Sequence, residues 1–190
     1  MKSPKVSIII PTYNEGKNIE KVLTKVQKLF ATLESVEVIV IDDGSTDQTA
    51  AEIENFAFVK YIAHNKNRGK GAAIRTGFHV ATGDIYVIQD ADLEYLPSDI
   101  PTLLRPIMSG QADVVYGSRF KGSQIGMSLL HLLGNRILSL TTRLLYQVPM
   151  TDVETGYKCF TREVVESLDL KENGFNIDVE ITAQILKNAW

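Results

Sequence analysis

Residues 86–94 read Tyr-Val-Ile-Gln-Asp-Ala-Asp-Leu-Glu, a short apolar run that ends in acidic side chains. Such a run is typical of a strand in a parallel sheet that is covered on both faces. In an open α/β sheet, ligands bind beyond the carboxyl ends of the strands. A metal and a phosphate are therefore expected at Asp90 and Asp92, because Mg²⁺ is usually bound by one or two carboxylates plus substrate phosphates. By itself, an Asp-x-Asp sequence is also common in solvent-exposed turns. Other residues of the chain must therefore distinguish a metal site from such a turn.

The composition indicates one soluble globular domain. The chain has 190 residues, of which 44% are hydrophobic and 23% charged, enough for one sizeable core and too short for two. The single cysteine, Cys159, excludes an intramolecular disulfide and fits a reducing compartment. No signal-peptide pattern and no transmembrane run of roughly 18 apolar residues is visible. The net charge of −3 is ordinary, and no nucleic-acid partner is expected.

Predicted strands alternate with predicted helices. The strands are expected at residues 6–10, 36–41, 58–63, 84–89, 112–116 and near 160. The helices are expected at 18–33, 47–56, 70–81, 97–108, 162–168 and 175–190. This alternation indicates βαβ units, so the predicted fold class is α/β, with a mostly parallel sheet and helices on both faces. Ser45 or Thr46 is expected to cap the second helix, and Pro101 and Pro106 to make the fourth irregular.

Polar turns follow the predicted strands at residues 11–15, 42–47 and 90–94. In a doubly wound sheet, such turns converge on one crevice. Tyr13 offers a ring on which a nucleobase can stack, and Glu15 or Asp42 can accept hydrogen bonds from base N–H groups or ribose hydroxyls. Each residue has an ordinary structural explanation by itself. Together with the Asp-x-Asp pair, they favour a nucleotide-diphosphate site.

Lys70 stands between Gly69 and Gly71, and can reach a phosphate or the base because the glycines allow close approach of the backbone. Two common phosphate motifs do not fit this loop. A Walker loop needs Ser or Thr after the lysine, and the dinucleotide fingerprint needs a glycine where Ile74 stands.

A leucine-rich stretch near 126–148 predicts an amphipathic helix. Arg136 and Arg143 lie on one flank of its apolar stripe, and no acidic residue occurs between Asp113 and Asp152. Such a helix either packs on the domain core or lies in a membrane interface with its arginines toward lipid phosphates. The sequence supports both interpretations.

These motifs resemble those of the family 2 glycosyltransferases of GT-A fold, over essentially the whole chain. The matching stretches lie at residues 7–15, 40–47, 67–71 and 90–92. Stretches 90–94, 117–120 and 155–158 look more narrowly like the dolichyl- and polyprenyl-phosphate mannose or glucose synthases. The resemblance implies a single GT-A catalytic domain over 1–190, with a Rossmann-like sheet. Chains of that group usually continue with another strand, basic residues and often transmembrane helices, whereas this chain stops at Trp190. It is therefore expected either to be truncated or to attach to the membrane through the predicted helix and a partner.

The resemblance also implies a role for each motif residue. The cation, Mg²⁺ or Mn²⁺, would be held by Asp90 and Asp92. The catalytic residues expected are Asp92 and Arg119, on the resemblance, and Asp152, on its chemistry as a base, with a loop-capping role as the alternative for Asp152. The residues expected to bind the nucleotide sugar are Pro11, Tyr13, Glu15, Asp42, Asp43, Gly69, Lys70, Asp90 and Glu94. The acceptor implied is a polyprenyl phosphate, so a membrane surface is an expected partner and a peripheral position on its cytoplasmic face the expected location.

The expected reaction is inverting transfer of a hexose from a donor of the UDP-glucose or GDP-mannose type, with the cation neutralising the departing charge. Arg119 would face the donor or acceptor phosphates. A phosphate acceptor is already anionic near neutral pH and needs no general base. A saccharide hydroxyl would need one, for which Asp152 is the first candidate and Glu94 the second.

Three alternatives differ in chemistry. Transfer to a saccharide hydroxyl, in polysaccharide or glycoconjugate synthesis, would use the same donor site. A sugar nucleotidylyltransferase would need a glycine-rich Arg loop, which residues 11–16 lack. A non-catalytic nucleotide-sugar-binding module is disfavoured because every metal and nucleotide candidate is present. Asp178 and Glu180 are interpreted as helix-start charges stabilised by the helix dipole. The sequence leaves the donor's base and sugar and the oligomeric state open.

Overall fold

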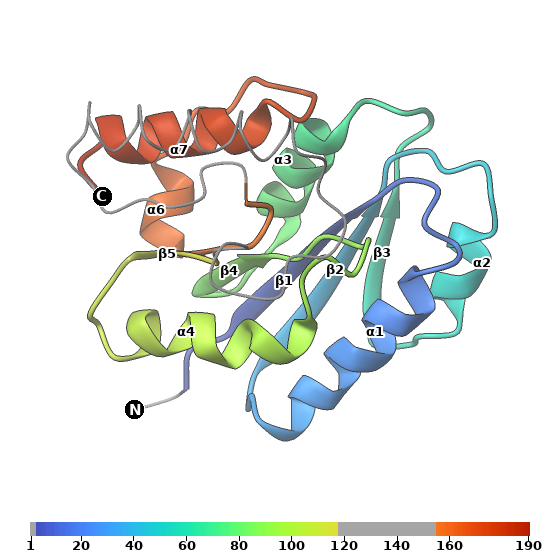
Figure 1. Cartoon of the computed structure of the whole chain (residues 1–190), viewed down its shortest axis with the longest axis horizontal. Helices are drawn as coiled ribbons and strands as arrows, with labels where there is room; N and C mark the ends of the chain where they lie inside the picture. Colours follow the sequence, from blue (N-terminus) through green and yellow to red (C-terminus); the bar gives the residue numbers. More distant parts are fainter. Residues whose placement is uncertain (1–2, 118–154) are drawn as a thin grey trace.

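The structure, a computed structural model, describes residues 3–117 and 155–190. The helix expected near 126–148, Arg119 and Asp152 lie outside these residues. The described chain forms three layers, with a central sheet between two groups of helices (Figure 1). No helix in this part of the chain is both long enough and apolar enough to cross a bilayer.

Within the described residues, the sheet has six strands in the order β3-β2-β1-β4-β6-β5. The strands are β1 (Val6–Thr12), β2 (Val36–Asp42), β3 (Val59–Ala63), β4 (Ile85–Ile88), β5 (Val114–Tyr116) and β6 (Lys158–Thr161). Strands β1 to β4 pair in parallel, whereas β6 is antiparallel to both β4 and β5. The predicted α/β class with a mostly parallel sheet is therefore confirmed.

Helices cover both faces of the sheet, because the strands are apolar on both sides. The helices are α1 (Ile19–Gln27), η1 (Lys28–Ala31), α2 (Thr49–Glu54), α3 (Lys70–Val80), η2 (Pro97–Asp99), α4 (Ile100–Met108), α6 (Arg162–Glu166) and α7 (Ile177–Lys187). Ile8 and Ile10 of β1 pack with α1, α2 and α4, while Ile9 packs with α3, α6 and α7. Burying each such side chain contributes roughly 1.5–3 kcal/mol. Gly77 lets α3 lie close to β1, since a Cβ there would overlap Ile9.

Three local predictions differ from the structure. The first helix ends at Gln27 and continues as the 3₁₀ turn η1, and the last ends at Lys187, so Trp190 lies beyond it. Neither Ser45 nor Thr46 caps α2. The hydroxyl of Ser45 accepts the N–H of Asn14, and the N–H of Thr46 donates to the Asn14 side chain. These polar groups are used to tie two turns together, and the carboxylate of Asp47 accepts the Thr49 N–H instead.

The helix predicted over 97–108 is irregular, as expected from its prolines. It forms a 3₁₀ turn, η2, followed by α4. Pro101 lies in the first turn of α4, where a missing N–H costs little. Pro106 lies inside the helix, where its missing N–H cannot donate to the carbonyl of Thr102. Beyond the helix, Pro106 O accepts the N–H of Gln111. The two prolines therefore shape the helix without ending it.

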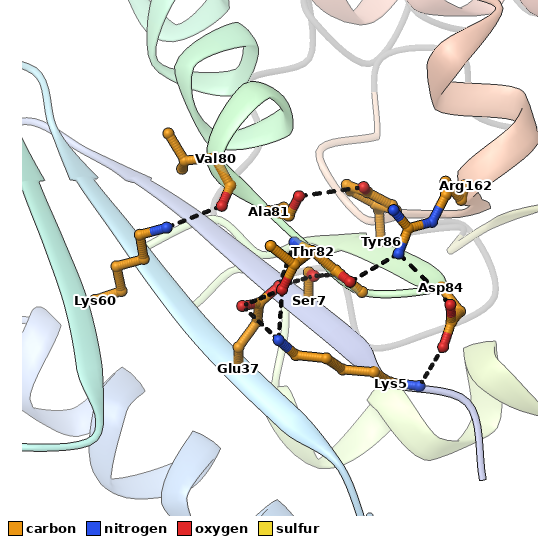
Figure 2. A network of polar contacts seen from close by, with 11 residues as sticks. Lys5, Ser7, Glu37, Lys60, Val80, Ala81, Thr82, Asp84, Tyr86 and Arg162 are labelled. Carbon is orange, nitrogen blue, oxygen red and sulfur yellow. Dashed lines mark hydrogen bonds and ion pairs between the residues drawn. The ribbon is translucent and has the colours of Figure 1, made fainter. Parts of the chain in front are cut away.

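A network of polar contacts lies at the amino-terminal ends of the parallel strands, whereas the predicted site lies at their carboxyl ends (Figure 2). The carboxylate of Glu37 accepts hydrogen bonds from Ser7 Oγ at 2.5 Å, Thr82 N at 2.6 Å and Lys5 Nζ at 2.9 Å. Burial alone would raise the pKa of Glu37, but these hydrogen bonds outweigh it and lower the pKa to about 2. Arg162 joins the network through Thr82 O at 2.7 Å, which ties α6 to the same edge. The network is a structural feature that the sequence did not predict.

Candidate active site

A cavity of about 360 Å³ opens at the carboxyl ends of β1, β2 and β4. This volume lies within the usual range for small-molecule sites. The predicted site residues that line it are Pro11, Tyr13, Glu15, Asp43, Gly69, Lys70, Asp90 and Asp92. The other lining residues are Thr12, Asn67, Ala73, Ala91 and Phe175. Most of the residues expected to bind the nucleotide sugar are thus gathered around one cavity.

The turn after β1 presents an aromatic ring and a carboxylate to the cavity. The Tyr13 side chain is 45% exposed, although it is large and apolar. The next residue, Asn14, has a φ of 54°, a left-handed conformation that asparagine tolerates better than most residues. Its side chain and N–H are bonded to the turn after β2, which holds this conformation. Glu15 is oriented by Asn18, whose Nδ2 donates to Glu15 Oε2 at 2.8 Å.

Asp43 holds the glycine-lysine-glycine loop in place. Its buried carboxylate accepts the N–H of Arg68 at 3.0 Å and that of Gly69 at 2.6 Å, and it contacts His64 Nδ1 at 2.6 Å. Gly69 has a φ of 96°, which strongly favours glycine, and a Cβ there would overlap Asn173 O. Although Asp43 lines the cavity, most of its acceptor capacity is used by the protein. Its geometry fits positioning of the loop better than direct contact with a nucleoside.

Two predicted site residues, Asp42 and Glu94, do not line the cavity. Asp42 is buried, and its oxygens accept the N–H of Ser45 and the hydroxyl of Tyr61, each at 2.8 Å. Burial, then this hydrogen bond, raises the pKa of Tyr61 to about 12. The backbone N–H of Glu94 donates to Asp92 Oδ1 at 2.9 Å. Asp42 thus supports the turn after β2, and the backbone of Glu94 orients Asp92.

Asp90 and Asp92 lie beyond β4, where the sequence places them. The Asp92 side chain is exposed, yet partial desolvation by the surrounding turn raises its pKa; the N–H of Glu94 opposes this rise, and the negative charges of Asp90 and Glu94 add to it. A cation bound here would relieve that repulsion. Leu93, between Asp92 and Glu94, has a φ of 65°, uncommon for a leucine, so the turn is locally strained. Asp90 is packed against Gly156, where a Cβ would overlap its carboxylate.

The carboxylate pair fits a hard divalent cation that is shared with a ligand. Within the described residues, no cluster of three or more acidic, histidine or cysteine side chains is suited to hold a metal. Asp90 and Asp92 would therefore supply one or two ligands, with phosphate oxygens or water completing the shell, as is usual for Mg²⁺. Lys70 Nζ already lies 2.9 Å from Asp90 Oδ1, so a cation would share this carboxylate with an ammonium group.

Two charged residues behind this site, Asp178 and Lys158, were not predicted as site residues. Asp178 lies in the first turn of α7, as the helix-start interpretation expects, but it is also buried, which that interpretation does not explain. It contacts Lys158 Nζ at 2.5 Å and Lys70 Nζ at 3.3 Å. Burial alone would raise the pKa of Asp178, but these two lysines lower it. One signal was present: Asp178 directly follows Ile177, which with Ile181 and Ile185 forms the buried stripe of α7.

Glu180, the other predicted helix-start charge, accepts the backbone N–H groups of Lys171 and Glu172. It therefore shapes the loop that precedes α7. In the same loop, Phe175 lines the cavity with a side chain that is 81% exposed, and it too was not predicted as a site residue. Arg75 holds this loop against α3 through Glu172 O and Asn173 Oδ1, each at 2.7 Å.

The amino-acid sequence matches one family model, described as glycosyl transferase family 2, over residues 7–168. It is 35% identical over 187 residues to a dolichol-phosphate mannosyltransferase of Pyrococcus furiosus, covering 93% of this chain and 52% of that protein. It is 29% identical over 196 residues to a polyprenol monophosphomannose synthase of Mycolicibacterium smegmatis, covering 96% of this chain and 72% of that protein. The chain thus spans about half the length of the Pyrococcus relative.

The fold is similar to that of glucosyl-3-phosphoglycerate synthase from Mycobacterium tuberculosis in complex with phosphoglyceric acid. The TM-score is 0.81 at 23% identity, covering 97% of this chain and 66% of that one. The same synthase in complex with Mn²⁺ and UDP-glucose gives a TM-score of 0.78 at 23% identity, covering 97% and 65%. At this identity the likeness concerns the fold, and it confirms the expected GT-A type. Because the family model covers most of the chain, this protein belongs to glycosyl transferase family 2.

Proposed function

We propose that this chain is the catalytic domain of a hexosyltransferase that moves a sugar from a nucleotide-diphosphate donor to a polyprenyl phosphate. The observation that carries the proposal is the cavity in which Tyr13, Lys70 and the Asp90–Asp92 pair lie together. An aromatic ring suits a nucleobase, while a lysine and a carboxylate-bound cation suit a diphosphate. The names of the Pyrococcus and Mycolicibacterium relatives support a polyprenyl-phosphate acceptor.

The residues that line the cavity support a specific mode of donor binding. Tyr13 and Glu15 would hold the base and ribose at the end of β1. Asp43 would act indirectly, by keeping Gly69 and Lys70 where the diphosphate passes. Burial alone would lower the pKa of Lys70, but Asp90 and Asp178 raise it, so its ammonium group stays charged for an anionic ligand.

Asp90 and Asp92 would hold Mg²⁺ or Mn²⁺, which would supply Lewis-acid neutralisation of the charge on the leaving diphosphate. The fold neighbour was solved with Mn²⁺ and UDP-glucose, and a ligand set of this kind is proposed here. A phosphate acceptor is already an anion and would attack the anomeric carbon from the face opposite the leaving group, inverting it. Arg119, outside the described residues, remains our candidate for contacting phosphates. Asp152 remains the candidate base for the alternative transfer to a saccharide hydroxyl.

The test is transfer of labelled sugar from UDP-glucose and from GDP-mannose to undecaprenyl phosphate in detergent, with and without Mn²⁺. We expect one donor to label the lipid only with the cation, and Asp92→Ala to abolish this while the circular dichroism spectrum is unchanged. Labelling of an added oligosaccharide instead would support the hydroxyl alternative. Labelling of the lipid by Asp92→Ala at the rate of the unmodified protein would refute the site assignment.

A further inference from the structure

Lys70 is shared between two carboxylates that come from different parts of the sheet edge. Its Nζ lies 2.9 Å from Asp90 Oδ1 and 3.3 Å from Asp178 Oδ2. Lys70 starts α3, Asp90 follows β4, and Asp178 lies in the first turn of α7. Only Asp90 of these two carboxylates lines the cavity, so Lys70 has one partner inside the site and one behind it.

Asp178 in turn is shared between two lysines. Lys158 Nζ lies 2.5 Å from Asp178 Oδ1, and also donates to the backbone oxygen of Thr155. The Lys158 side chain is completely buried, and its ammonium group lies 5.2 Å from the centre of the Tyr116 ring. Asp90, Lys70, Asp178 and Lys158 thus form a row of alternating charges that ends at the proposed cation site.

We propose that Asp178 is a positioning residue: it is the second anchor of Lys70, and it holds the Lys70 ammonium group when a cation takes over Asp90. The inference rests on the proposed function, because it assumes a cation at Asp90 and Asp92. A divalent cation and an ammonium group on one carboxylate repel each other. The Lys70 side chain is only 15% exposed, and an ammonium group in such a position is destabilised if it loses its counter-charge. With Asp178 present, Lys70 keeps a carboxylate partner without leaving the cavity wall.

Lys158 determines how strongly Asp178 attracts the Lys70 ammonium group. Because Lys158 neutralises much of the Asp178 charge, Asp178 holds Lys70 only in part, and Lys70 stays in reach of both Asp90 and the cavity. Removing Lys158 would leave Asp178 to pair with Lys70 alone and would draw Lys70 away from Asp90. Removing Asp178 would do the opposite and leave Lys70 on Asp90. The two changes should therefore move cation affinity in opposite directions.

The test compares Lys158→Met with the double variant Lys158→Met/Asp178→Asn. Both lack the buried Lys158 ammonium group, and they differ only in the charge at residue 178, so they are a matched pair. Replacing a buried ion pair by neutral side chains is often tolerated, which favours a folded double variant. Mn²⁺ affinity is read without any donor, from the electron paramagnetic resonance signal of free Mn²⁺, on protein whose thermal unfolding is cooperative.

We expect the double variant to bind Mn²⁺ about tenfold more weakly than Lys158→Met, at the low end of what partners of metal ligands contribute. In a Lys70→Met background, where no ammonium group competes for Asp90, removing the Lys158–Asp178 pair together, by Lys158→Met with Asp178→Asn, should leave Mn²⁺ affinity unaltered. Equal Mn²⁺ affinity of the matched pair, or an equal effect with Lys70 removed, overturns the proposal. The Asp92→Ala variant distinguishes failure of the proposed cation site from failure of the proposed role of Asp178. If Asp92→Ala binds Mn²⁺ as the unmodified protein does, the cation site is wrong. If Asp92→Ala loses Mn²⁺ binding but the matched pair shows equal affinity, only the role of Asp178 is refuted.

Discussion

Asp42 and Asp43 are adjacent, equally acidic and equally buried, at 3% exposure each, yet asparagine should affect them very differently. The carboxylate of Asp42 accepts one backbone N–H, from Ser45, and one hydroxyl, from Tyr61. An asparagine can keep the first with its oxygen and turn its NH₂ toward the second, because a hydroxyl can accept as well as donate. Asp42→Asn should therefore cost about 1 kcal/mol of unfolding free energy or less.

Asp43 has no such freedom. It accepts the N–H groups of Arg68 and Gly69 on both oxygens, with His64 as a third partner. Backbone N–H groups cannot reverse, so an NH₂ at residue 43 must face a donor. Losing one or two charge-assisted hydrogen bonds, at roughly 1.5–3 kcal/mol each, predicts a cost of about 3 kcal/mol. The Gly69–Gly71 loop should loosen as well, which should weaken nucleotide binding because Lys70 moves with it.

Urea denaturation measures the first effect, and titration calorimetry with UDP and GDP in the presence of Mn²⁺ measures the second. We expect Asp42→Asn to bind the preferred nucleotide as the unmodified protein does, and Asp43→Asn to bind it about tenfold more weakly, which is roughly 1.4 kcal/mol. The two variants are controls for each other. Loss of binding in Asp42→Asn alone would refute the division of roles and restore Asp42 as a direct nucleoside ligand.

Three further predictions concern other parts of the chain. The pKa of Glu37 is lowered to about 2, so its contribution to stability should be full above its ordinary pKa of 4.5 and lost as the pH falls toward 2. The Glu37→Gln variant should therefore be less stable than the unmodified protein by about 1 kcal/mol at pH 7, allowing for solvent screening. Urea titrations should show that this difference in unfolding free energy disappears near pH 2. A difference that does not change with pH would contradict this prediction. Tyr13→Ala should weaken nucleotide binding roughly tenfold by calorimetry, as expected for loss of a stacking ring, and unchanged affinity would exclude Tyr13 as the base platform. Arg136→Glu with Arg143→Glu should weaken sedimentation with anionic vesicles, and equal binding would favour a helix packed on the core.

The fold could be predicted because its signals are local. The apolar runs of β1, β2 and β4 and the spacing of apolar residues in α1 each lie within a few consecutive residues, and together they specify a mostly parallel α/β sheet. The direction of β6 had no such signal, since a short strand reads the same in either direction. Helix ends were also less certain: Ser45 and Thr46 have the chemistry of caps but bond to the turn after β1 instead.

The candidate site divides in the same way. Residues at the ends of parallel strands, such as Tyr13 and Asp90, could be assigned from sequence because topology brings those ends together. Nothing in the sequence separates Asp42 from Asp43, whose roles depend on which way each carboxylate turns after β2. The pairing of Lys70 with Asp178 joins residues 108 positions apart. Such contacts are determined only by the tertiary structure, because the packing of α3, β6 and α7 brings these charged side chains together. Their neighbours in the sequence do not indicate which charges will pair.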